Sequence, residues 1–169
     1  AIGYQILHVG PIGSASVLKV ATNYLASTHL VAVGEALMVC KKAGLDLSTV
    51  YEGIKISSGN SFVHETESQV IMNGSYNINF TMDLVCKDVG LFEKLAQDLK
   101  VPTEVSPLIT KIFSEGRNKY GDRAWSSMIV KRQEDACNEN LRAPGYPEEL
   151  IDDTPRRQGY EIIPKNINS

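Results

Sequence analysis

Apolar and polar positions divide this chain into helical segments of very unequal length. The longest runs from Gly13 to Gly44 and contains neither a proline nor a cluster of turn residues. It is apolar over most of its circumference, and its last residues, Lys41 and Lys42 before the glycine, are stop signals of a helix. Such a helix is on the order of 40 Å long. Because this exceeds the core of a small domain, we expect other helices to pack around it.

Shorter helical patterns follow, with connections of the length usual in helical domains. They are centred on residues 48–56, 62–72, 82–99, 107–120 and 126–138. We expect Asp46 or Ser48 to cap the first, Thr81 to cap the third, and Ser106 to cap the fourth with Pro107 in its first helical position. No segment alternates with period two over six residues. The sequence therefore predicts an all-α, multi-helical domain built around one long N-terminal helix.

Both ends of the chain differ from this helical middle. Residues 1–12 contain a short apolar segment that leads directly into the long helix, and the sequence opens without an initiator methionine. After residue 139, four of the seven prolines fall among charged residues. We therefore expect a linker at 1–12 from a preceding part of a longer protein, a helical domain at 13–139, and an extended tail at 140–169 that is ordered by docking.

Composition excludes several functional classes. A hydrophobic fraction of 43% supports a real core, and a net charge of −3 gives no general electrostatic case for binding nucleic acid. The three cysteines are far apart and form no CxxC pair, which favours a reducing, cytoplasmic setting without disulfides. The histidines have no metal-ligand spacing, so no metal site is expected. The apolar run 20–40 contains Asn23, His29 and Glu35, which argues against a membrane span.

Two lysines are candidates for chemistry. Lys19 lies in the second turn of the long helix, and Asn23 follows one turn later on the same face. An ammonium and a carboxamide together can hold an oxygen-rich substrate, with the lysine as proton donor. Lys87 and Asp88 lie in the middle of a helix, where the lysine is suited to an anionic ligand such as a phosphate. The alternatives remain open: a solvated Lys19 with a surface Asn23, and an i,i+4 ion pair between Asp83 and Lys87.

Three separated motifs agree with one family. HVGPIGSASVLKVATNYL, VGEALMVCKKAGLD and NFTMDLVCKDVGLFEKLAQDLKVP, in this order and spacing, resemble the C-terminal half of the β-hydroxyacid dehydrogenases, the family of 3-hydroxyisobutyrate dehydrogenase and tartronate semialdehyde reductase. The resemblance covers about residues 8–135. It implies an all-α fold like the C-terminal domain of 6-phosphogluconate dehydrogenase. It also implies a small hydroxyacid substrate, NAD or NADP as cofactor, a Rossmann domain N-terminal to this segment, and homo-oligomerisation.

The resemblance also implies roles for individual residues. Lys19 matches the catalytic lysine that donates a proton during reduction and withdraws it during oxidation, and Asn23 matches the asparagine that holds the substrate. The other matching positions are Gly13, Ser14 and Phe80 near the substrate, and Lys87 and Asp88 at the cofactor.

Departures from related branches narrow the assignment. Thr22 stands where the 6-phosphogluconate dehydrogenases have a histidine, and Lys19 is usually replaced in the imine reductases of this fold. Ala15 replaces a usual glycine. The glycine-rich phosphate loop and the Ser-Gly-Gly substrate loop of the Rossmann domain do not occur in this sequence. The first hypothesis is therefore a dehydrogenase's C-terminal domain, inactive alone; the second is a non-catalytic helical dimerisation module in which both lysines are solvated.

Overall fold

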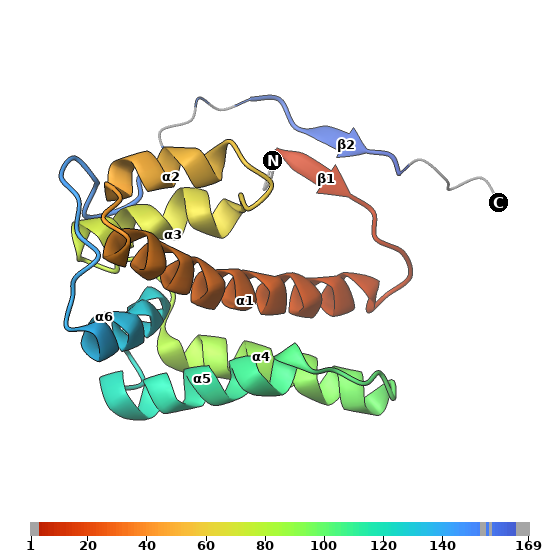
Figure 1. Cartoon of the computed structure of the whole chain (residues 1–169). Helices are drawn as coiled ribbons and strands as arrows, with labels where there is room; N and C mark the ends of the chain where they lie inside the picture. The colour runs from red at the N-terminus through yellow and green to blue at the C-terminus, as the bar shows by residue number, and fades with distance from the viewer. Residues whose placement is uncertain (1–3, 153–154, 156, 165–169) are drawn as a thin grey trace. The chain divides into compact units, whose positions relative to one another are not determined.

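The computed structural model of the chain describes residues 4–152, 155 and 157–164 (Figure 1). The chain divides into two compact units, Ala1–Lys19 with Ile151–Ser169, and Val20–Leu150. The elements in chain order are β1 (Gln5–Leu7), α1 (Ser14–Lys42), α2 (Leu47–Lys55), α3 (Phe62–Asn73), α4 (Met82–Asp98), α5 (Val105–Tyr120), the 3-10 helix η1 (Ser126–Val130), α6 (Lys131–Cys137) and β2 (Tyr160–Ile162). The predicted all-α class is confirmed.

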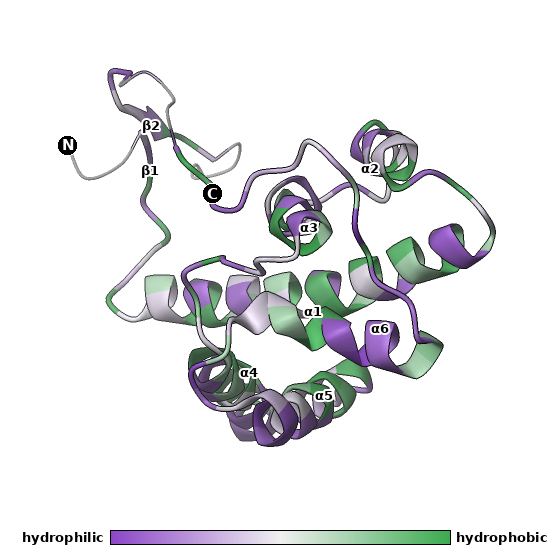
Figure 2. Ribbon diagram, turned by 90° about the vertical axis from the view of Figure 1, so that its left-hand side faces the viewer, coloured by the Kyte–Doolittle hydropathy of each residue, from purple (hydrophilic) through white to green (hydrophobic). Residues whose placement is uncertain are grey.

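Helix α1 organises the larger unit. Two views agree that α2 and α3 lie on one side of it and α4 and α5 on the other (Figure 1, Figure 2). A helix covered on two sides must be apolar over most of its circumference, as this one is. Its buried residues include Leu30, Leu37 and Met38. In the part of the chain that the structure describes, no helix is both long and apolar enough to cross a membrane.

Two glycines let the η1 segment approach the helices closely. A Cβ added to Gly34 of α1 would lie 2.7 Å from Cγ2 of Val130, and one added to Gly116 of α5 would lie 2.4 Å from Cδ1 of Ile129. Ile129 and Val130 are themselves buried. The absence of a side chain at both glycines therefore sets the distance at which η1 packs into the core.

Helix starts follow the sequence signals in part. Asp46 caps α2 as expected, and its side chain accepts a hydrogen bond from the Thr49 N–H at 2.8 Å. Thr81 occupies the N-cap of α4, but its hydroxyl donates to the Asp83 carboxylate at 2.5 Å and does not accept from the backbone.

The predicted start of α5 at Ser106 and Pro107 is wrong. The helix begins at Val105 with Glu104 as N-cap, and Ser106 is buried inside it. Pro107 is tolerated there because the first four N–H groups of a helix have no intrahelical acceptor.

The last predicted helix is two helices of different type. Residues 126–130 form the 3-10 helix η1, and α6 continues from Lys131 to Cys137. Asn138 ends α6 in the left-handed conformation, with φ of 48°. A periodicity argument does not distinguish a 3-10 turn from an α turn over five residues.

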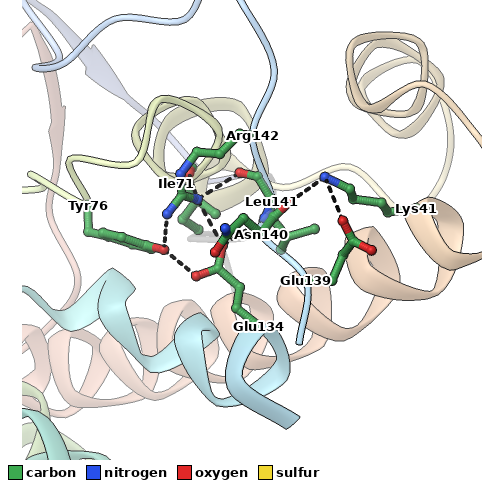
Figure 3. Close-up of polar contacts among 8 residues, drawn as sticks. All are labelled: Lys41, Ile71, Tyr76, Glu134, Glu139, Asn140, Leu141 and Arg142. Carbon is green, nitrogen blue, oxygen red and sulfur yellow. Dashed lines mark hydrogen bonds and ion pairs between the residues drawn. The ribbon is translucent and has the colours of Figure 1, made fainter. Parts of the chain in front are cut away.

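Residues 140–150 pack against the helices of the larger unit and form hydrogen bonds with them. Leu141 is fully buried, and the Ala143 N–H donates to the Met72 carbonyl at 3.1 Å. Tyr76, Glu134 and Arg142 hold this segment through a buried polar cluster (Figure 3). These contacts hold residues 140–150 against the helices, and the tail at 140–169 stays a prediction.

The smaller unit contains the only pairing of two strands among the described residues. β1 and β2 are parallel, with Gln5 opposite Tyr160 and Leu7 opposite Ile162. The Tyr4 and Tyr160 rings meet edge to face at 5.2 Å. Three-residue strands carry no alternation that a sequence pattern would reveal, so the pairing was not predicted.

Candidate functional site

A cavity of about 240 Å³ lies in the larger unit where α1, α3, α4 and η1 meet. Its wall combines apolar side chains with carboxyl, amide and hydroxyl groups. The lining residues are Asn23, Ala26, Ser27, Leu30, Glu67, Phe80, Val85, Asp88 and Ser126. Three of them, Asn23, Phe80 and Asp88, are residues that the sequence analysis assigned to substrate or cofactor.

Asn23 and Asp88 form the polar centre of this cavity. The Asn23 amide nitrogen donates to the Asp88 carboxylate at 2.5 Å, which joins α1 to α4. Asp88 is only 2% exposed, whereas the Lys87 side chain is 59% exposed and its ammonium lies 3.3 Å from the same carboxylate. Asp88 therefore orients the amide on the cavity side and holds the lysine on the solvent side. Asp83 pairs instead with Arg123 at 3.4 Å, so the alternative of an Asp83–Lys87 pair is not supported.

Packing of α1 on α4 keeps these groups in place. The Tyr24 and Phe92 rings stack with centroids 3.9 Å apart and an interplanar angle of 6°. One turn after Asn23, the Ser27 hydroxyl donates to the Asn23 carbonyl at 2.9 Å. The residues that flank the amide are thus fixed by aromatic contact and by a local hydrogen bond.

Phe80 approaches the cavity from the segment between α3 and α4. It is half-buried, and its carbonyl accepts a hydrogen bond from the Ser126 N–H at 2.8 Å. This bond fixes the backbone that precedes α4 against the start of η1. Phe80 therefore lines the same cavity as Asn23, and its role at the substrate stays a prediction.

Glu67 is an ionisable residue of the cavity that the sequence did not single out. It comes from α3, its Oε2 is fully buried, and this oxygen has no hydrogen-bond partner among the described residues. Burial raises the pKa of Glu67 from 4.5 to about 8. A signal existed in the sequence: Val63, Glu67, Val70 and Ile71 follow the spacing of one helix face, and the other three are buried.

The remaining predicted residues belong to the smaller unit. Gly13 precedes α1 with φ of 101°, and the Ser14 N–H donates to the Pro11 carbonyl at 3.0 Å. Lys19 is exposed in the second turn of α1. Their roles at the substrate stay predictions.

His64 has a structural place in the core. His64 is fully buried, donates from Nε2 to the Tyr51 carbonyl at 2.9 Å, and accepts the Ser68 hydroxyl at Nδ1 at 3.1 Å. Both ring nitrogens are thus satisfied inside the core. No group of three His, Cys, Asp or Glu side chains suited to a metal ion occurs in the residues that the structure describes.

Comparison with known proteins matches these features to one family. A family model described as "NAD-binding of NADP-dependent 3-hydroxyisobutyrate dehydrogenase" matches residues 13–132, which include α1 to α5, η1 and every cavity residue. This chain belongs to the 3-hydroxyisobutyrate dehydrogenase family. The family is NAD- or NADP-dependent, and the resemblance drawn from the three sequence motifs is confirmed.

Curated relatives in the family are hydroxyacid dehydrogenases. The chain is 34% identical over 131 residues to 2-(hydroxymethyl)glutarate dehydrogenase of Eubacterium barkeri, covering 77% of this chain and 44% of that protein. It is 28% identical over 132 residues to L-threonate dehydrogenase of Haemophilus influenzae, covering 78% of this chain and 44% of that protein. The chain thus spans less than half the length of these two relatives.

Solved structures share the helical fold of this family member. The crystal structure of 3-hydroxyisobutyrate dehydrogenase from Salmonella typhimurium matches with a TM-score of 0.66 and 27% identity, over 71% of this chain and 42% of that chain. The Mycobacterium tuberculosis 3-hydroxyisobutyrate dehydrogenase with L-serine matches with a TM-score of 0.68 and 20% identity, over 74% and 45%, which concerns the fold alone. The chain is the mostly helical domain of this dehydrogenase family.

Proposed function

We propose that this chain is the C-terminal domain of an NAD(P)-dependent 3-hydroxyacid dehydrogenase and supplies its acid–base lysine, Lys19. The observation that carries the proposal is the cavity in which Asn23 and Phe80 meet, with the Asn23 amide held by a buried Asp88 that also pairs with Lys87. The family membership gives the reaction class, and the polar centre gives the proposed substrate and cofactor contacts a physical basis.

Each residue has one role in the proposed reaction. The nicotinamide cofactor, when bound, supplies the acceptor for the hydride that leaves the carbinol carbon. As the carbonyl forms, the neutral amine of Lys19 accepts the hydroxyl proton, and in reduction its ammonium returns that proton. Asn23, one turn further along α1, holds the substrate oxygen. Asp88 acts as a positioning residue through the Asn23 amide.

The exposed Lys87 is suited to the cofactor. Its ammonium points outward from α4 while Asp88 restrains it, so it retains N–H donors for an anionic phosphate group. Gly13 and Ser14 open α1 and are proposed to lie near the substrate, where backbone N–H groups at a helix start favour negative charge.

The proposed domain organisation follows from the same assignment. Residues 1–12 would link to an N-terminal Rossmann domain, 13–139 form the catalytic and oligomerisation domain, and 140–169 form the tail. Exposed apolar side chains in the turn between α4 and α5 and in the first turn of α5 support a homo-oligomer; they are Leu99, Val101, Val105 and Leu108. The three widely separated cysteines support a cytoplasmic location.

The relatives provide a panel of test substrates. 2-(Hydroxymethyl)glutarate, L-threonate and 3-hydroxyisobutyrate each combine a carboxylate with a nearby hydroxyl group, and they differ in the rest of the molecule. The first has a second carboxylate, the second has further hydroxyl groups, and the third has only a methyl group. The enzyme joined to its Rossmann domain is expected to oxidise at least one of them.

Replacing Lys19 tests the acid–base assignment. In the complete enzyme, Lys19→Ala is expected to lower kcat by roughly 10²–10⁴-fold while the cofactor dissociation constant stays nearly unchanged. The matched control is Lys94→Ala, which removes an exposed lysine that pairs with Asp98 on α4. Steady-state kinetics and a cofactor titration by fluorescence measure both quantities. Turnover retained by Lys19→Ala would eliminate the proposed role and favour the non-catalytic helical module.

Replacing Lys87 separates the cofactor contact from proton transfer. Lys87→Ala is expected to weaken cofactor binding about tenfold or more, because a charge-assisted hydrogen bond to an anion is lost. An unchanged dissociation constant for both NAD and NADP would contradict this contact.

A further inference from the structure

The Glu67 carboxyl lines the cavity with a buried oxygen, and the proposed reaction gives it no role. Its buried oxygen has no partner among the described residues, although the great majority of buried polar side-chain atoms in proteins are hydrogen-bonded. Leaving such a group unsatisfied destabilises the folded state, because the carboxyl has lost its hydrogen bonds to water without replacement. This destabilisation would be removed by a ligand that enters the cavity and bonds to this carboxyl.

We propose that Glu67 determines substrate specificity: as a neutral carboxylic acid, it hydrogen-bonds a hydroxyl group of a polyhydroxylated acid other than the hydroxyl that is oxidised. The inference rests on the proposed function, because it takes the cavity beside Asn23 as the place where the substrate lies. It adds a residue on α3 to the proposed residues that line the same cavity, which are Asn23 of α1, Asp88 of α4 and Phe80 of the segment before α4.

The groups on the cavity wall disfavour a second carboxylate on the substrate. The lining residues contain two carboxyl groups, those of Glu67 and Asp88, and no Lys, Arg or His. An additional carboxylate in this cavity would lie near the Asp88 carboxylate, which already pairs with Lys87, and no Lys, Arg or His of the lining is left to bind it. A substrate with a second carboxylate is therefore disfavoured relative to one with a neutral polar group.

The protonation state of Glu67 favours a hydroxyl over an ammonium. Desolvation raises the pKa of Glu67 to about 8, so the group is neutral at pH 7. A neutral carboxyl donates one hydrogen bond and accepts others, which complements a hydroxyl group. Asp88 on α4 is the other titratable group on the cavity wall, while α1 and η1 contribute Ser27 and Ser126, whose hydroxyls provide further partners.

The size of the cavity agrees with a small polyhydroxylated acid. The cavity volume of about 240 Å³ is several times the roughly 30 Å³ that one water molecule occupies in the liquid. Apolar side chains cover the rest of the wall, among them Leu30 and Val85. A few polar groups on an otherwise apolar wall are typical of sites that orient a small ligand.

Two substrates that differ in their additional hydroxyl groups test the proposal in the complete enzyme. L-Threonate has hydroxyl groups besides the one that is oxidised, and 3-hydroxyisobutyrate has none. Glu67→Leu is expected to lower kcat/KM for L-threonate by roughly tenfold to a hundredfold while 3-hydroxyisobutyrate changes by less than about threefold. An equal loss for both substrates would mean a structural role and would overturn the proposal.

The amide variant separates a neutral partner from a charged one. Glu67→Gln keeps a donor and an acceptor, so kcat/KM for L-threonate is expected to stay within about fivefold of the wild type at pH 7. In the wild type, the ratio of kcat/KM for L-threonate to that for 3-hydroxyisobutyrate should fall above about pH 8, and in Glu67→Gln it should not. Taking the ratio cancels pH effects that are common to both substrates. A Gln variant as impaired as the Leu variant would overturn the neutral form in favour of a carboxylate that binds a cation.

Direct binding distinguishes failure of this inference from failure of the proposed function. The side-chain carboxyl resonance of Glu67 in ¹³C-labelled chain is expected to shift on addition of L-threonate at pH 7, and less on addition of 3-hydroxyisobutyrate. A wild-type enzyme that oxidises none of the panel while this shift occurs would refute the dehydrogenase assignment alone. Turnover of L-threonate without any dependence on Glu67 would refute the specificity role alone.

Discussion

Glu134 anchors the 140–150 segment, and changing it to glutamine tests that anchor with little change of shape. Its carboxylate is 3% exposed and accepts hydrogen bonds from the Tyr76 hydroxyl, from the Leu141 N–H at 2.8 Å and from the Arg142 guanidinium at 2.8 Å (Figure 3). Arg142 also donates to the Tyr76 hydroxyl at 2.6 Å. Burial and the bond to Glu134 raise the pKa of Tyr76, so its hydroxyl keeps its proton and donates.

The cost of Glu134→Gln follows from these contacts. The amide oxygen still accepts one or two of the bonds, but the charge opposite Arg142 is lost and an N–H₂ group faces a tyrosine hydroxyl that already accepts from the guanidinium. Hydrogen bonds to charged groups are worth about 1.5–3 kcal/mol each. The Arg142 side chain is 34% exposed, so water recovers part of its loss. We expect the free energy of unfolding to fall by about 2–3 kcal/mol.

Urea unfolding followed by circular dichroism measures this change. The control is Glu139→Gln, whose carboxylate lies 3.4–3.5 Å from Lys41 and Lys42 near the surface and should matter by less than about 0.5 kcal/mol. Arg142→Met combined with Glu134→Gln should recover about 1–2 kcal/mol relative to additivity, because both ends of one pair are removed. A Glu134→Gln stability within 0.5 kcal/mol of the wild type, or simple additivity in the double variant, would refute the anchor.

Three further changes test the core and the cavity. Glu67 keeps its proton up to about pH 8 in the folded state and up to about pH 4.5 in the unfolded state, so the folded state binds more protons between these values. The free energy of unfolding should therefore fall as pH rises from 4.5 to 8, by at most about 1.4 kcal/mol per pH unit. Glu67→Gln should flatten this slope, and Glu52→Gln at an exposed position should not. Gly34→Ala should destabilise by about 1–3 kcal/mol because the new Cβ would lie 2.7 Å from Val130, and an unchanged urea midpoint would contradict that close contact. Gly53→Ala, with open space at the same kind of helical position in α2, should stabilise by about 0.5–1 kcal/mol, and a lower midpoint would mean that its surroundings are not open.

Local signals in the sequence account for the helices. The apolar run and basic end of α1, the Asp46 cap and the glycine after α3 are each read from neighbouring residues, because helix formation depends on contacts within a few positions. The start of α5 was misassigned because the burial of Ser106 depends on packing that its neighbours do not specify.

The candidate site could be predicted only as separate residues. Motif spacing pointed to Asn23, Phe80 and Asp88, but nothing in the sequence said that the amide of the first would donate to the carboxylate of the last across 65 positions. In the sequence, Glu67 is one polar residue among others on a helix. Only in the folded chain does its carboxyl lie at a cavity lined also by α1 and α4, where desolvation raises its pKa.

By itself, the sequence determined the helical class, the long α1 helix, the family and the residue types available for chemistry. Periodicity and motif spacing are local properties of the chain, so they can be recognised in the sequence alone. The tertiary structure decided which of those residues share a cavity, which carboxyl has a partner and which is buried without one, and that Glu134 anchors the chain after α6. Burial and hydrogen-bond satisfaction arise only when distant segments pack together, so only the folded chain reveals them.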